Sequence, residues 1–288
     1  MKVIYDDAIQ QSPLVIFSSL PISSPFDHAS LSIDPQLSSD SFIALLDDTT
    51  NRVARSSSDQ PLIYYHPSHS PSPQELKKPH PSNLLGSQDP LCPIRSVVLH
   101  LQAPNCLNTF IRFPPLDKSC LYNTVLGVQL PFLHLQIKPL NHTFMIEVGV
   151  TDQAGDRIVI RCSNFQTEAR QYSRPKSSPQ LIHIPIVFPS PKSPAQTSWT
   201  DLLIPLANLI PSKYQSTDFI KVHANIRLRR IYFTIDGKQP TLDSNRDRNQ
   251  YDEDVKQVIQ TEDSNIQSIT SLFRPELLLF QGHQSADD

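Results

Sequence analysis

Glycine is scarce in this chain, with 6 residues among 288. No closely spaced glycines form the G-x-G-x-x-G loop of dinucleotide-binding domains or the phosphate loop of nucleoside triphosphatases. The H-E-x-x-H signature of zinc peptidases and the G-x-S-x-G elbow of serine hydrolases are also missing. The sequence therefore predicts no catalytic residues. It favours a binding or structural protein over an enzyme, and we expect no small-molecule substrate.

Cysteine is scarce too, with four residues. No two of them form a C-x-x-C pair, and no histidine lies at zinc-ligand spacing from any of them. Four thiols would make a thin disulfide framework for this length, which favours free thiols in a reducing compartment. Cys162 could be paired with His183 or His223 as a nucleophile and its base. However, Cys162 lies on the apolar side of its segment, which is typical of a buried structural thiol. We expect no metal ion and no cofactor.

Long hydrophobic runs are missing as well, and no segment approaches the roughly 20 apolar residues of a membrane-spanning helix. The first residues, MKVIYDDAIQQ, place Asp6 and Asp7 before a short apolar run, which is the wrong order for a signal peptide. We expect a cytosolic or nuclear protein without a membrane partner.

Proline is abundant, with 27 residues, and twelve of them fall in the first 93 positions. Residues 34–92 are rich in serine, proline and aspartate, and HPSHSPSPQELKKPHPS at 66–82 is of low complexity. Such a segment buries too little apolar surface to offset the entropy lost on ordering. We predict that 34–92 is a disordered linker or insertion that follows an N-terminal segment at 1–33.

Charge is unevenly distributed along the chain. Residues 93–236 hold 15 Lys and Arg against 8 Asp and Glu, whereas residues 1–92 and 237–288 each hold 5 against 10. A basic middle flanked by two acidic arms suggests an acidic partner for the middle. An ordinary soluble domain with solvated tails is the alternative interpretation.

From residue 93 onward, apolar and polar residues alternate with a period of two, as in half-buried strands. We expect strands at 96–102, 109–113, 130–138, 143–151, 157–162, 181–188, 199–206, 217–224 and 225–233. Gly155 lies in a predicted turn and is suited to positive φ. Residues 207–214 are expected to form one helical turn, cut by Pro211. The pattern predicts an all-β fold, either an antiparallel sandwich or a barrel.

The last part of the chain, 237–288, reads as an acidic tail. Apolar residues recur at helix-like spacing over 251–273, which favours an acidic amphipathic helix there. A solvated tail is the alternative.

The segment HANIRLRRIYF at 223–233 has the β-branched and aromatic residues of a strand, yet carries three arginines in four positions. Ile226 and Leu228 share one face, and the pattern then slips by one residue before Ile231. We predict a β-bulge near Arg229–Arg230 that restores the register.

This bulge would place four polar side chains of the strand on the outer face of its sheet, namely Arg227, Arg229, Arg230 and Tyr232. Lys221 and His223 of the preceding strand would join them, with Asn225 at a tight corner between the two strands. Arg157 and Arg161 would extend the face if their strand lies in the same sheet. These eight residues are the candidate partner-binding site. In the alternative interpretation, the arginines pair with acidic residues such as Glu147, Asp218 or Asp236, although the basic surplus of 93–236 leaves too few carboxylates to pair them all.

Several segments together resemble the cilia- and flagella-associated protein 20 domain family. They are LGVQLPFLHLQIKPL at 126–140, RCSNFQTEAR at 161–170, Trp199 at the start of a strand and, above all, HANIRLRRIYF. The resemblance covers about 93–236, and SPLVIFSSLPISSPF at 12–26 is a candidate for the first strand of the family's domain. Its usual leading glycine and following tryptophan are absent, and the proline-rich 189–198 is a further departure.

The resemblance implies a β-sandwich, jelly-roll-like, that binds microtubules in cilia, flagella or centrioles. It implies tubulin and other axonemal or centriolar proteins as partners, and a place in the cytoskeleton. The basic surface suits acidic tubulin. A basic sheet also suits phosphate, so a nuclear nucleic-acid-binding protein is an alternative, although nucleic acid is disfavoured because stacking aromatics are sparse. A glycan-binding sandwich is the third hypothesis. It would require secretion of the protein and a surface of Trp or Tyr side chains on which sugars stack.

Overall fold

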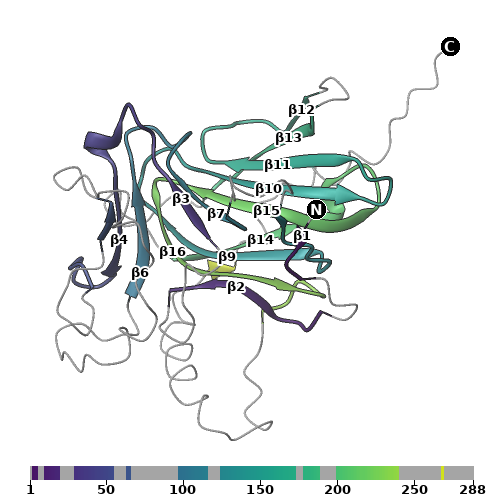
Figure 1. Ribbon diagram of the computed structural model, residues 1–288, viewed down its shortest axis with the longest axis horizontal. Helices are drawn as coiled ribbons and strands as arrows, with labels where there is room; N and C mark the ends of the chain where they lie inside the picture. The colour runs from purple at the N-terminus through teal and green to yellow at the C-terminus, as the bar shows by residue number, and fades with distance from the viewer. Residues whose placement is uncertain are drawn as a thin grey trace, which may run out of the picture.

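Two β-sheets packed face to face build the protein, and their strands interleave along the chain (Figure 1). The computed structural model describes residues 2–5, 10–19, 29–54, 63–65, 97–115, 124–172, 178–188, 199–239 and 267–268.

The seven-stranded sheet has the order β12-β13-β11-β10-β15-β7-β3. Its strands are β3 (Ser30–Ser32), β7 (Phe110–Phe113), β10 (Met145–Asp152), β11 (Arg157–Ser163), β12 (Arg170–Tyr172), β13 (Gln180–Pro185) and β15 (Tyr214–His223). All neighbours are antiparallel except β11 and β13, which run parallel.

The eight-stranded sheet has the order β17-β14-β9-β16-β6-β4-β5, and β2 pairs with β16 off this path. Its strands are β2 (Leu14–Ser18), β4 (Phe42–Asp47), β5 (Ile63–Tyr65), β6 (Val97–Gln102), β9 (Phe132–Pro139), β14 (Thr200–Pro205), β16 (Ile226–Thr234) and β17 (Gln267–Ser268). β6 pairs with residues 226–228 of β16, and β2 pairs with residues 230–233. Both strands therefore support β16, one at each end.

Three short elements complete the described structure. β1 (Lys2–Val3) runs parallel to β8 (Thr124–Val125) as a two-stranded sheet, while η1 (Ser38–Asp40) is a 3-10 turn and α1 (Leu206–Leu209) is one turn of α-helix. In the part of the chain that the structure describes, no helix is long and apolar enough to cross a membrane.

The core lies between the two sheets and consists of the apolar residues that alternate along the strands. Ile226, Leu228, Ile231 and Phe233 of β16 are all fully buried in it, opposite residues such as Ile146 of β10. Burial of a large aliphatic or aromatic side chain contributes about 1.5–3 kcal/mol. The predicted all-β sandwich is thus confirmed, with the parallel pair β11–β13 as an addition to an otherwise antiparallel scheme.

Two local predictions are also met. The register of β16 against β9 shifts between Leu228 and Arg230, so Arg229 is the extra residue of a β-bulge. Gly155 has φ +85° in the turn between β10 and β11, where the Asp152 carboxylate accepts a hydrogen bond from the backbone N–H of Asp156.

The prediction of disorder across 34–92 is wrong for its first part. Residues 29–54 are described, and β4 pairs with β6 along its whole length. Ile43, Ala44 and Leu45 are almost completely buried. The prediction relied on the high serine and proline content of the wider segment and neglected the short apolar run FIALL. This run is buried because it pairs with β6. The low-complexity stretch 66–82 lies outside the described residues.

The acidic tail is described only in part. Gln267 and Ser268 form β17 beside β14, which contradicts a helix at those two positions. The other residues of 251–273 lie outside the described residues.

Candidate partner-binding faces

The eight candidate residues do not share one face, because the strands that carry them lie in opposite sheets. β15 belongs to the seven-stranded sheet and β16 to the eight-stranded sheet. Asn225, between them, is not a hairpin corner and does not have positive φ. Its buried amide accepts a hydrogen bond from the Ala103 N–H and donates one to the Thr143 carbonyl, so it ties the crossover to two loops.

The prediction of a single basic face is therefore wrong in its grouping. Arg227, Arg229, Arg230 and Tyr232 lie on the outer side of the eight-stranded sheet, whereas Arg157, Arg161, Lys221 and His223 lie on the outer side of the seven-stranded sheet. The separation arises because the chain crosses the sandwich at Asn225, a change of layer that period-two alternation does not reveal.

Arg227 is engaged with acceptors that follow β4 in the chain. Its guanidinium donates to the Asp48 carboxylate and to the Asn51 side-chain oxygen, and the arginine is 9% exposed. The same carboxylate accepts from Lys138 Nζ at 3.2 Å and from the indole N–H of Trp199 at 2.7 Å. Arg227 is thus a structural ion-pair residue rather than a solvated one.

Asp48 stays ionised in this cluster. Burial by itself would raise the pKa of its carboxyl, but hydrogen bonds from Arg227 and Trp199, with the charge of Lys138, lower the pKa below the ordinary value.

The remaining β16 side chains are also enclosed. The Arg229 guanidinium lies 5.2 Å from the Trp199 ring centroid, and Arg229 is 6% exposed. Tyr232 is buried, stacks on His134 with centroids 4.5 Å apart, and donates a 2.8 Å hydrogen bond to Asp201. Burial, reinforced by Asp201, raises the pKa of Tyr232. Of the four β16 candidates, Arg230 alone is half-buried rather than buried.

On the outer face of the seven-stranded sheet, the Glu147 carboxylate contacts three basic side chains. Glu147 of β10 accepts from Arg161 at 2.7 Å and from Lys221 at 3.2 Å, and its carboxylate lies 3.4 Å from His223 Nε2. Glu147 is 7% exposed. Burial would raise the pKa of Glu147, but His223, Lys221 and Arg161 together hold it far below the ordinary value.

These cations remain accessible to different degrees. The side chains of Arg161 and Lys221 are 28% and 25% exposed, whereas His223 is buried and its Nδ1 bonds to the Cys106 carbonyl. Arg157, at the start of β11, is exposed. Its prediction as a surface cation therefore fits the structure.

A nucleophile with a nearby base does occur among the described residues, but it is sealed from solvent. Ser163 Oγ lies 2.7 Å from His183 Nε2, and the serine is fully buried. Cys162 is fully buried as well, and burial raises the pKa of its thiol to about 12, so it is no nucleophile at neutral pH. Among the described residues, no group of three or more His, Cys, Asp and Glu side chains is placed to hold a metal ion.

Several residues of these faces escaped the sequence analysis, among them Asp48, Arg112 and Arg170. Asp48 lies in the segment taken as disordered, and Arg112 and Arg170 were not singled out. Arg170 pairs in register with His183 of β13, which pairs in turn with Arg161. Arg112 pairs in register with Lys221. The alternation of 109–113 would have placed Arg112 opposite the core, and this was the available signal.

A comparison with known protein families finds a match to the CFA20 domain over residues 89–241. The chain belongs to this family. The matched region holds both β15 and β16 and all eight candidate residues. The earlier resemblance to the cilia- and flagella-associated protein 20 domain is confirmed.

Curated relatives of this CFA20 domain protein carry the name cilia- and flagella-associated protein 20. The protein of Chlamydomonas reinhardtii is 35% identical over 141 residues, which are 49% of this chain and 67% of that protein. The protein of Paramecium tetraurelia is 31% identical over 49% of this chain and 66% of its own length, and that of Caenorhabditis elegans is 29% identical over 49% and 62%. The chain thus spans about two thirds of each relative's length. A solved structure titled "Structural analysis of an exo-beta-agarase" overlays with a TM-score of 0.30 and 11% sequence identity, over 81% of this chain and 25% of that chain. This similarity is too low to indicate a shared fold or function.

Proposed function

We propose that this protein is a non-enzymatic structural component of cilia or flagella that binds microtubules, alongside other axonemal or centriolar proteins. Membership of the CFA20 domain family, with relatives named for cilia and flagella, is the observation that carries the proposal. It supports a ciliary or flagellar location and a structural rather than catalytic role.

The outer face of the seven-stranded sheet is the better surface for such binding. Its charged side chains, in the part of the chain described, are Arg112, Arg157, Arg161, Arg170 and Lys221 against Glu147, Glu168 and Asp218. The cations are in excess, and Arg157 and Arg170 are exposed. On the opposite face, Arg227 and Arg229 are buried. Because tubulin is acidic, an accessible cationic surface is the expected counterpart.

Co-sedimentation of the full chain with microtubules across a salt series tests the proposal. The double variant Arg157→Ala/Arg170→Ala should pellet less than the wild type, and binding of the wild type should weaken as salt rises. The variant Arg52→Ala/Lys238→Ala removes the same charge from exposed positions elsewhere and should pellet like the wild type. A wild type that does not pellet at low salt, or equal losses in both variants, would count against this face. Retention on nucleic acid at physiological salt would instead favour the nuclear alternative.

A further inference from the structure

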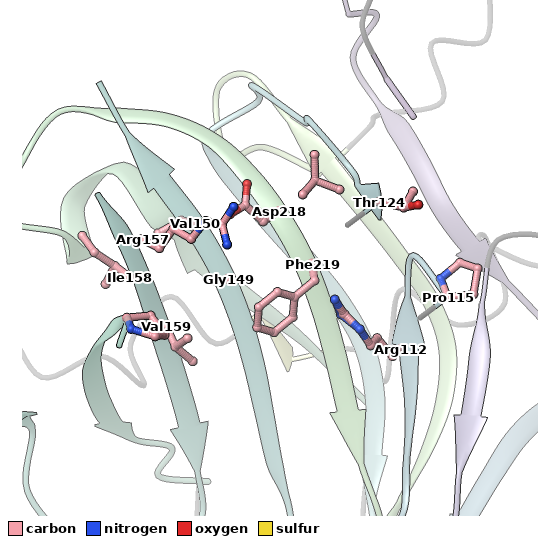
Figure 2. Close-up of a pocket in the computed structure, with 12 residues that line it drawn as sticks. Arg112, Pro115, Thr124, Gly149, Val150, Arg157, Ile158, Val159, Asp218 and Phe219 are labelled. Atoms are coloured by element: carbon pink, nitrogen blue, oxygen red, sulfur yellow. The ribbon is translucent and has the colours of Figure 1, made fainter. Parts of the chain in front are cut away.

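A pocket of about 220 Å³ opens on the outer face of the seven-stranded sheet (Figure 2). It is lined by side chains from β7, β8, β10, β11 and β15, with Pro115 and Pro179 beside them. Its volume is below the roughly 300–1,000 Å³ of drug-sized sites, so it suits a single side chain better than a whole small molecule.

Arg112 lines this pocket, and two of its guanidinium nitrogens have no hydrogen-bond partner. The residue is 8% exposed, and its Nε and Nη1 atoms are buried without any hydrogen-bond partner. Its guanidinium carbon lies 4.5 Å from the ring centroid of Phe219, and Figure 2 shows the two side chains next to one another. Stacking uses the flat face of a guanidinium and leaves its in-plane N–H groups free to donate.

Asp218 and Glu147, the two carboxylates whose charges act on Arg112, make their hydrogen bonds to other residues. Glu147 accepts from Arg161 and Lys221, and Asp218 accepts from the Thr151 hydroxyl at 2.7 Å. Burial lowers the pKa of Arg112 to about 10, although the charges of Asp218 and Glu147 oppose the shift. A buried cation with unused donors is costly, and an anionic acceptor would relieve that cost.

Gly149 makes room for the Phe219 ring on which Arg112 stacks. It pairs in register with Phe219, and a Cβ atom added at Gly149 would lie 2.1 Å from the Phe219 ring. The ring therefore lies flat across the glycine, which is a common way for an aromatic residue to cover a strand glycine. Glycine here permits the stack that orients Arg112.

The charge of the pocket selects the class of anion. Arg112 and Arg157 against Asp218 leave a net charge of about one positive unit in the described lining. A singly charged carboxylate balances this charge, whereas a phosphate group, which carries about −1.5 to −2 at neutral pH, would leave the pocket with a negative net charge.

We propose that this pocket binds the carboxylate of a glutamate or aspartate side chain from an acidic segment of a partner protein, with Arg112 as the principal donor. Arg157, at the exposed start of β11, adds a second cation. Guanidinium–carboxylate hydrogen bonds are among the strong ones in proteins. The assignment goes beyond microtubule binding, because it does not require the partner to be tubulin.

The test uses the full chain and an acetylated, amidated hexaglutamate peptide, with hexaglutamine as the uncharged probe, followed by fluorescence anisotropy at physiological salt. We expect the wild type to bind hexaglutamate and not hexaglutamine. Arg112→Met, which keeps the length of the side chain, should weaken hexaglutamate binding by about tenfold or more. Lys238→Met removes a charge from an exposed position outside this face and should change the affinity by less than about twofold, as for an exposed ion pair.

Arg112→Met should fold at least as stably as the wild type, because it removes an unpaired buried cation. If it does not fold, Arg112→Lys is the substitute, since lysine keeps the charge but loses the planar donors. Equal hexaglutamate binding by the folded Arg112 variant and the wild type, or no preference over hexaglutamine, overturns the proposal. Stronger competition by inorganic phosphate than by acetate overturns the carboxylate assignment.

Microtubule pelleting of the same preparations separates the two proposals. Wild-type protein that binds hexaglutamate but does not pellet counts against the proposed function alone. Protein that pellets but does not bind hexaglutamate counts against the pocket alone.

Discussion

The guanidinium of Arg227 and the carboxylate of Asp48 form an ion pair between residues 179 positions apart in the chain. The pair joins β16, in the middle of the eight-stranded sheet, to the loop after β4. Arg227, predicted to lie on an exposed binding surface, is instead buried in an ion pair between two distant segments of the chain.

Replacement of Asp48 by alanine should destabilise the protein. It leaves Arg227 buried without its carboxylate and removes the acceptor of Trp199 and Lys138. We expect a loss of about 3 kcal/mol in the free energy of unfolding, as for other ion pairs broken on one side. Urea denaturation of the full chain measures it.

Asp40→Ala is the matched control, because Asp40 is exposed in η1 of the same segment. It should change the free energy of unfolding by less than about 0.5 kcal/mol. Similar small losses in both variants would mean that the pair with Arg227 contributes little.

A chain that begins at residue 93 should fail to fold cooperatively. It lacks β2 and β4, which pair with β16 and β6, and it exposes the faces that Ile43 and Leu45 cover. Thermal melting followed by circular dichroism should show no sharp transition. Deletion of 66–82, predicted from its composition to be solvated, should leave the melting temperature unchanged. A sharp, wild-type-like transition in the truncated chain would contradict the assignment of β2 and β4 to the core.

Acid should weaken the fold partly through Glu147. Its folded-state pKa lies below the unfolded value of about 4.5, so the stabilisation is complete above that pH and is lost as the pH falls further. Glu147→Gln should therefore flatten the decline of unfolding free energy below pH 4.5, measured by urea denaturation across a pH series.

Glu168→Gln is the control for this pH series, because the Glu168 side chain is 73% exposed. It should keep the wild-type slope. An unchanged slope in Glu147→Gln would show that its ion pairs with Arg161 and Lys221 do not favour the ionised form.

Gly149→Ala should displace the Phe219 ring, because the new Cβ would overlap it. We expect a loss of about 1–3 kcal/mol in stability and weaker hexaglutamate binding, since Arg112 loses its platform. With Phe219→Leu as background, the cost of Gly149→Ala should shrink, because the ring that clashes is gone. Additive losses in this double-mutant cycle would show that the strain arises elsewhere.

Alternation along the strands was enough to predict most of the fold. The buried side of β16, its bulge at Arg229 and the positive φ of Gly155 all follow from local chemistry, because pleating and turn geometry act over a few residues. β4 was missed since a five-residue apolar run in a serine- and proline-rich segment has no local sign of its partner.

The sequence by itself determined that the chain forms β-strands with one apolar side and that its middle is basic. Only the tertiary structure decided where the charges lie. The crossover at Asn225 sends Lys221 and Arg227 to opposite faces, and Asp48 and Trp199 arrive from distant segments to enclose the β16 arginines. The environment of a charge depends on groups brought together by long-range pairing, whereas the side of a strand on which it lies depends only on its neighbours in sequence.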